Sequence, residues 1–204
     1  MSYSVSGQDY SKAALIIWDM QYAIARRAFN YEYIVPNIGK LIDGAILSSL
    51  PVIYSKHVFL PPEYMDPYMV YSLKRRGIDP ASGVMSSQDQ HEWQIINEIA
   101  PRKNDLVLEK YSSSFFVGTI LNNVLRKKEV TILILTGVST EGGIESTARQ
   151  AATSGYLPLI VSDAVGSSDQ GIHEAMLKVM RKVFEVRETQ NVLDEFLRKK
   201  TDNS

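Results

Sequence analysis

The chain has 204 residues, 45% of them hydrophobic, and a formal net charge of -1, which describes a globular protein large enough to bury a core without cross-links. The balanced charge excludes the basic surface that nucleic acid or an anionic membrane requires. No apolar run reaches the roughly 18 residues of a membrane span, and the N-terminus has no apolar core of signal-peptide length. Because the chain has no cysteine, disulfides, thiolate nucleophiles and Cys-ligated metals are also excluded. We expect one cytoplasmic domain, residues 1–204.

The first half of the chain predicts two strands, one helix and a long connection. Ala13–Trp18 is a continuous apolar run, typical of a strand buried on both faces, and Asp19 follows it directly. Residues 33–50 repeat apolar side chains at three- and four-residue spacing, as in an amphipathic helix, and residues 51–59 predict a second strand. Residues 60–90 contain Pro and Gly without a sustained period, which indicates irregular loops with at most a short helix.

The second half alternates strands with helices. We predict strands over residues 105–110, 130–135, 157–161 and 183–186, and helices over residues 92–100, 115–127, 141–154, 171–182 and 192–197. Alternation through the whole chain predicts a three-layer α/β fold of Rossmann-like type. Its open, mostly parallel sheet of six strands is covered by helices on both faces.

Three polar features are expected at the carboxyl ends of the strands, where such sheets bind ligands. They are Asp19 after the first strand, Lys110 at the end of the third, and the turn at residues 139–143 after the fourth. A carboxylate and an ammonium held together there can orient a nucleophile or polarise a carbonyl. The alternative is that Asp19 caps a helix and that Lys110 is a solvated strand end.

Three blocks of sequence resemble a known family. LIIWDMQ, LEKYSSSFFVGTIL and TILILTGVSTEGGIESTARQAATSGYLPLIVSDAVGSSD occur in that order within residues 13–187. They are similar to the signature blocks of the isochorismatase-like, or cysteine hydrolase, superfamily, especially its branch with N-carbamoylsarcosine amidohydrolase, nicotinamidase and isochorismatase. The resemblance implies an isochorismatase-like hydrolase domain with that core.

The resemblance also implies a site. The family's amidohydrolases use an Asp, a Lys and a Cys, which match Asp19, Lys110 and, in place of the cysteine, Gly143. The family's turn implies a non-proline cis peptide between Val138 and Ser139. It also implies an oxyanion cradle at Ser139, Thr140 and Gly142, with the amides of Gly142 and Gly143 as donors.

The resemblance therefore predicts a hydrolase that acts on a small carbonyl, amide or vinyl-ether metabolite without a cysteine nucleophile. Asp19 is expected to activate water or transfer a proton, with Lys110 as its electrostatic partner. The alternative is a catalytically silent member that binds a small ligand or a protein. A replacement nucleophile among the neighbouring hydroxyls is disfavoured because each has a role as a cap or turn former; these are Ser112, Ser139, Thr140 and Ser146.

The surroundings of the site complete these expectations. His57, Tyr111 and Phe115 are predicted to line the pocket. Trp18, next to Asp19, is expected to alternate to the opposite face of its strand and to pack against a helix. No metal is expected, because Ser55 stands two residues before His57, where the family's metal-binding members have an aspartate. No cofactor is expected either. The resemblance also implies a homodimer or homotetramer, with residues 60–90 as the candidate interface.

Overall fold

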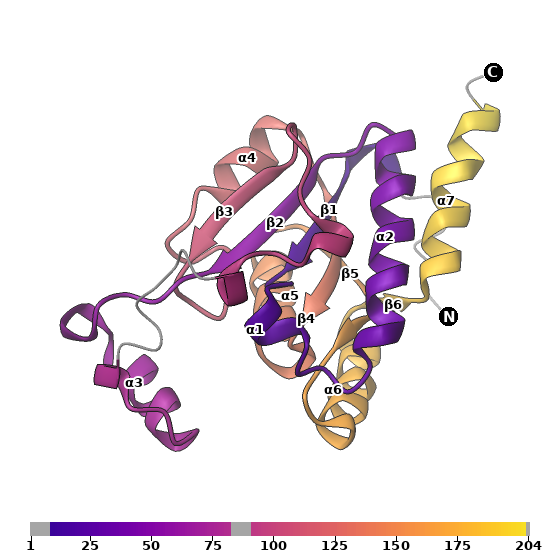
Figure 1. The fold of residues 1–204 in the computed structure, drawn as a ribbon. Coiled ribbons are helices and arrows are strands. Elements are labelled where there is room, and N and C mark those ends of the chain that lie inside the picture. Colours follow the sequence, from indigo (N-terminus) through magenta and orange to yellow (C-terminus); the bar gives the residue numbers. More distant parts are fainter. Residues whose placement is uncertain (1–8, 83–90, 203–204) are drawn as a thin grey trace.

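The computed structural model describes residues 9–82 and 91–202, which form one six-stranded parallel sheet covered by helices on both faces (Figure 1). The strand order is β3-β2-β1-β4-β5-β6. The strands are β1 (Ala13–Trp18), β2 (Val52–His57), β3 (Leu106–Lys110), β4 (Ile132–Val138), β5 (Leu157–Gly166) and β6 (Glu185–Arg187). The predicted fold class is confirmed.

Strand β1 lies at the centre of the sheet. Leu15 pairs with Val52 of β2 on one side and with Ile134 of β4 on the other. From β1 the chain builds the sheet outward to β3 in one direction, and β4 then restarts on the other side of β1. The carboxyl ends of β1 and β4 therefore flank the topological switch point, where open α/β sheets leave a crevice for ligands.

The helices divide between the two faces. The helical elements are α1 (Tyr22–Ala25), α2 (Tyr31–Leu47), α3 (Pro67–Arg75), α4 (Leu121–Lys127), a π-helical turn (Thr140–Ile144), α5 (Glu145–Thr153), α6 (Gln170–Val183) and α7 (Thr189–Asp202). Apolar residues of α2 and α7 pack on one face of the sheet, and those of α4, α5 and α6 pack on the other. Successive residues of β1 alternate between these two cores, as a strand buried on both faces must.

Three predicted helices differ from the structure. Residues 92–100 form two short 3₁₀ turns, His91–Trp93 and Asn97–Ile99, because the backbone between them bridges to Gln21. The helix predicted from residue 115 begins only at Leu121, because Gly118 has a φ of 74° and ends the turn before it. The last helix is longer than predicted, since α7 begins at Thr189 and continues to Asp202.

Residues 60–82 form 3₁₀ turns and the nine-residue helix α3, which stands away from the body of the molecule (Figure 1). This agrees with the prediction of a short helix within loops. The rest of the candidate interface, residues 83–90, lies outside the described residues. Within the described parts of the chain, no helix has the length and apolarity needed to cross a membrane.

Candidate active site

Asp19 ends β1 in a left-handed backbone conformation, with a φ of 47°. A non-glycine residue rarely adopts this conformation, although aspartate tolerates it better than most. The side chain is 2% exposed, and its backbone N–H donates to Oγ of Ser55 across 3.0 Å. The change in backbone direction ends the strand and turns the carboxylate toward the ends of β2 and β3.

Asp19 and Lys110 form a buried ion pair. Nζ of Lys110 lies 2.7 Å from Oδ2 of Asp19, and neither side chain is more than 2% exposed. The other carboxylate oxygen, Oδ1, accepts a hydrogen bond of 2.5 Å from Oγ of Ser55. Both oxygens are thus held in place, which excludes the alternative of a helix cap and a solvated strand end.

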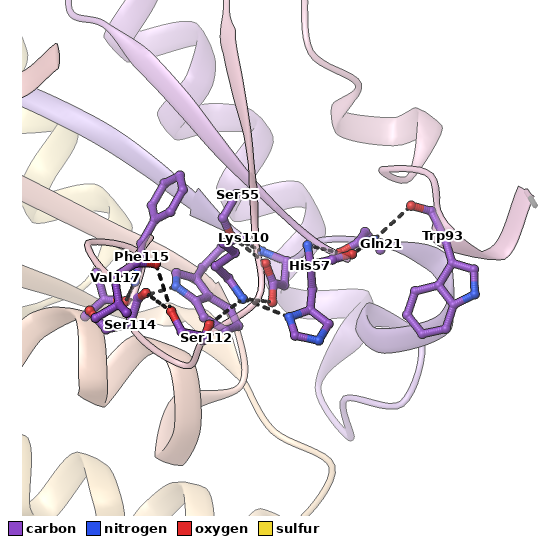
Figure 2. A network of polar contacts seen from close by, with 12 residues as sticks. Gln21, Ser55, His57, Trp93, Lys110, Ser112, Ser114, Phe115 and Val117 are labelled. Atoms are coloured by element: carbon purple, nitrogen blue, oxygen red, sulfur yellow. Dashed lines mark hydrogen bonds and ion pairs between the residues drawn. The ribbon is translucent and has the colours of Figure 1, made fainter. Parts of the chain in front are cut away.

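The ammonium of Lys110 has an acceptor for each of its three protons. Besides Asp19, Nζ donates to the carbonyl oxygen of Ser112 across 3.1 Å and lies 3.2 Å from Nδ1 of His57 (Figure 2). The ammonium also lies over the indole of Trp18, with Nζ 3.7 Å from the ring centroid. Lys110 is therefore placed to act through its charge rather than by handing a proton to a ligand.

His57 is held as a neutral acceptor at this site. Burial, together with the charge of Lys110, lowers the pKa of His57 from 6.5 to about 3. Because Nδ1 faces the ammonium, the ring proton belongs on Nε2. Gln21 fixes the backbone of His57, since its Oε1 accepts from the His57 N–H at 2.7 Å and its Nε2 donates to the His57 carbonyl at 3.0 Å (Figure 2).

Burial is also the largest influence on the ion pair itself. It raises the pKa of Asp19, against the opposing effects of Lys110 and Ser55. It lowers the pKa of Lys110, against the opposing effect of Asp19. Desolvation thus brings the proton affinities of the two groups closer together, which makes the carboxylate a stronger base than an ordinary aspartate.

The turn after β4 contains the predicted non-proline cis peptide between Val138 and Ser139, which is confirmed. The carbonyl of Ser139 accepts from the N–H of Gly142 at 3.3 Å. The hydroxyl of Thr140 is buried, donates to the carbonyl of Gly166 at 2.9 Å, and lies 2.8 Å from Nδ1 of His173. Both roles of the Thr140 hydroxyl are taken, which leaves it unsuited to replace a nucleophile.

The indole of Trp18 occupies the space in front of Gly143. A methyl group at position 143 would overlap Cη2, Cζ2 and Cε2 of Trp18. The expected packing of Trp18 against a helix is confirmed by the bond from Nε1 to Oγ1 of Thr147 in α5, at 3.0 Å. The ring also extends into the site, which the sequence did not indicate. The physical reason is that Gly143 has no Cβ, which leaves room for a large ring to extend into the site.

The other predicted residues lie at different depths around this centre. Phe115 is fully buried in the same core cluster as Trp18, whereas Tyr111 is 40% exposed. Ser112 uses its hydroxyl to bind the carbonyls of Ser114 and Val117. Glu145 pairs with Arg149 one turn further along α5, at 2.6 Å. Among the described residues, no group of three His, Cys, Asp or Glu side chains is arranged to hold a metal ion.

Comparison with known proteins places this geometry in a family. The sequence model of the isochorismatase domain matches residues 13–191. The chain belongs to the isochorismatase family. The match spans all six strands, from β1 to β6, and therefore both sides of the site.

Individual members of the isochorismatase family are similar at moderate identity. The chain is 28% identical over 192 residues to the uncharacterized isochorismatase family protein YwoC of Bacillus subtilis, covering 92% of this chain and 95% of the relative. It is 28% identical over 145 residues to the N-carbamoylsarcosine amidase of an Arthrobacter species, covering 69% of this chain. The match spans about half, 52%, of that amidase.

Among solved structures, a cysteine hydrolase from Pseudomonas syringae pv. phaseolicola superimposes with a TM-score of 0.81. It is 23% identical and the match covers 93% of this chain and 94% of the hydrolase. This likeness confirms the isochorismatase-family fold.

Sequence reasoning missed three residues of the site: Trp18, Gln21 and Ser55. Ser55 and Gln21 are each fully buried and polar, and the block LIIWDMQ includes both Trp18 and Gln21. The signal available for Ser55 was a small polar residue directly after the apolar residues Val52–Tyr54 of β2, because a buried hydroxyl requires a partner.

Proposed function

We propose that this isochorismatase-family protein hydrolyses a small amide or ureido metabolite by direct attack of water, with Asp19 as the general base and acid. The observation that carries the proposal is the buried ion pair between Asp19 and Lys110, at 2.7 Å, beside the switch point of the sheet. The amide class is supported by the similarity to an N-carbamoylsarcosine amidase.

The proposed reaction needs no covalent intermediate with the protein. Asp19 takes a proton from water while the water oxygen bonds to the carbonyl carbon of the substrate. Asp19 then gives the proton to the leaving nitrogen as the C–N bond breaks. The products are a carboxylic or carbamic acid and an amine. Lys110 remains charged, compensating the negative charge that develops on the carbonyl oxygen.

Several observations support this division of roles. The raised pKa of Asp19 suits a base that must bind and release a proton. The three acceptors around Nζ of Lys110 keep that residue an ammonium, and neutral His57 adds no competing charge. Ser55 orients the carboxylate through Oδ1 and leaves the pair with Lys110 intact.

The test is turnover of a panel of ureido acids, simple amides and isochorismate by the purified protein. We expect hydrolysis of at least one ureido acid or amide, and a loss of about 10²-fold or more in kcat for Asp19→Asn, roughly the contribution of one general base. Asp163→Asn is the matched control, because Asp163 is a hydrogen-bonded aspartate on β5 that binds Thr189 instead of Lys110. Equal activity in Asp19→Asn and wild type would refute the role of Asp19.

A second candidate, a ligand-binding member without turnover, is favoured by one observation. The indole of Trp18 fills the space at Gly143, and Asp19 and Lys110 are almost wholly enclosed. This candidate predicts that panel compounds raise the melting temperature of the wild-type protein without being hydrolysed. Turnover that depends on Asp19 would exclude it.

A further inference from the structure

Trp18 touches two parts of the site at once. One face of its indole contacts Nζ of Lys110, which lies 3.7 Å from the ring centroid. The edge of its six-membered ring occupies the space in front of Gly143. We propose that Trp18 is a positioning residue for Lys110 that also closes the site to a side-chain nucleophile at position 143. The effect of Trp18 on catalysis rests on the proposed function. The contacts of Trp18 with Lys110 and Gly143 do not depend on that function.

The indole is held where it lies. Nε1 donates to Oγ1 of Thr147 at 3.0 Å, and the same oxygen accepts from the backbone N–H of Phe115 at 3.1 Å. The side chain is 6% exposed and belongs to the core cluster that includes Phe115, Ile144 and Ala148. With one edge bonded to α5 and the ring packed among these neighbours, Trp18 is held in one position.

The position of Lys110 depends on this ring. Three acceptors surround the ammonium, and the face of the indole packs against it as well. An aromatic face stabilises a desolvated cation without accepting a proton from it. Replacing the ring by an aliphatic side chain of similar bulk would therefore leave Lys110 buried but less favourably charged.

The same ring makes glycine necessary at position 143. Even a methyl group there would overlap three atoms of the indole, all of which belong to the six-membered ring or its fusion. A single Gly143→Cys exchange, the obvious way to introduce a thiol, is thus expected to disrupt the packing rather than create a nucleophile. Trp18→Phe removes those atoms while keeping an aromatic face, so the thiol becomes compatible only in that background.

A double-mutant cycle of stability tests the geometric part. We expect Gly143→Ala to lower the melting temperature by roughly 3–10 °C in the Trp18 background, as overpacking does in a domain of this size. In the Trp18→Phe background the same exchange should change it little. Equal effects of Gly143→Ala in both backgrounds would overturn the proposed overlap. Trp18→Leu provides a second background if Trp18→Phe does not fold.

Alkylation tests the placement of Lys110. Because the natural chain has no cysteine, the double variant Trp18→Phe with Gly143→Cys contains one thiol, whose reaction with iodoacetamide can be followed against pH. We expect its apparent pKa to fall clearly below the value of about 8.5 for a free cysteine. It should return toward that value when Lys110→Met is added, or when Trp18→Leu is used in place of Trp18→Phe. Ala152→Cys, exposed on the same helix α5, is the reference thiol.

An apparent pKa for the thiol introduced at position 143 equal to that of the reference thiol would contradict the proposal. Neither the stability cycle nor the alkylation requires a substrate, so their failure is distinguishable from failure of the proposed hydrolysis. If hydrolysis is found, the pH profile of kcat/KM provides a further test, because a change in packing alone would not shift this profile. The profile should be shifted in Trp18→Leu and should match that of the wild type in Trp18→Phe.

Discussion

The backbone of Asp19 and two neighbouring side chains fix the orientation of its carboxylate. Its left-handed φ of 47° turns the chain at the end of β1. Ser55 binds Oδ1 and Lys110 binds Oδ2. A buried carboxylate with both oxygens satisfied is stable only while both partners remain, since an unpaired buried charge is costly. Asp19, Ser55 and Lys110 therefore depend on one another for stability.

Ser55→Ala tests that dependence. The change removes the donor to Oδ1 and leaves the carboxylate oxygen unsatisfied, so the free energy of unfolding should fall by about 1–3 kcal/mol. Urea denaturation measures it. Ser162→Ala on β5 is the control, because the hydroxyl of Ser162 donates to the carbonyl of Arg187 in a partly buried position away from the site. If Ser55→Ala lowered the free energy of unfolding no more than Ser162→Ala does, a special role for Ser55 would be contradicted.

At the scale of elements, the site depends on how closely β1 approaches β4. Gly137 of β4 pairs with Trp18, has a φ of 107°, and a Cβ there would overlap the backbone of Trp18. The register between β4 and β5 also shifts between Leu135 and Gly137. The local irregularity lets the end of β4 lead into the turn that carries Gly143.

Gly137→Ala should therefore be among the most destabilising glycine replacements in the chain. It combines an unfavourable backbone conformation with overlap against main-chain atoms that cannot move aside, so we expect a loss of about 3 kcal/mol or more. Gly39→Ala, inside helix α2 with open space around the added methyl, should instead stabilise by about 0.5–1 kcal/mol. Thermal unfolding of both variants gives the comparison, and similar losses in the two would contradict it.

At the scale of the whole molecule, burying a neutral histidine beside a cation makes folding sensitive to acid. The folded pKa of His57 is about 3 and its ordinary value is 6.5. Between these values the unfolded chain binds a proton that the folded chain does not. The stabilising effect of keeping His57 neutral is thus complete above pH 6.5 and is lost progressively as the pH falls toward 3.

We expect the free energy of unfolding to fall on acidification in this range by up to about 1.4 kcal/mol per pH unit on account of His57. His57→Gln does not titrate and retains an acceptor for Lys110, so its stability should depend less steeply on pH. His91→Gln, at a side chain that is 65% exposed, is the matched control for replacing a histidine by glutamine. Denaturation at several pH values would reject the prediction if all three slopes were equal.

Much of the fold follows from local patterns. The apolar runs of β1 and β4, and the spacing of apolar residues in α2 and α6, are properties of short stretches of chain, and the structure has these elements close to the predicted residues. The meeting of Asp19 and Lys110 also follows, because parallel strands bring their carboxyl ends to the same edge of the sheet. Short turns were less predictable, as residues 92–100 show, since their backbone bonds go to distant partners.

The sequence by itself determined the parallel α/β fold, the pair of charged residues at the strand ends and the absence of any thiol. Only the tertiary structure decided which side chain occupies the space in front of Gly143. Trp18 and Gly143 are far apart in the chain, and neither predicts the other. Their contact arises because a residue without a Cβ on the turn after β4 meets a large ring at the end of β1. Packing of this kind is a property of volumes brought together by the fold, which no local pattern records.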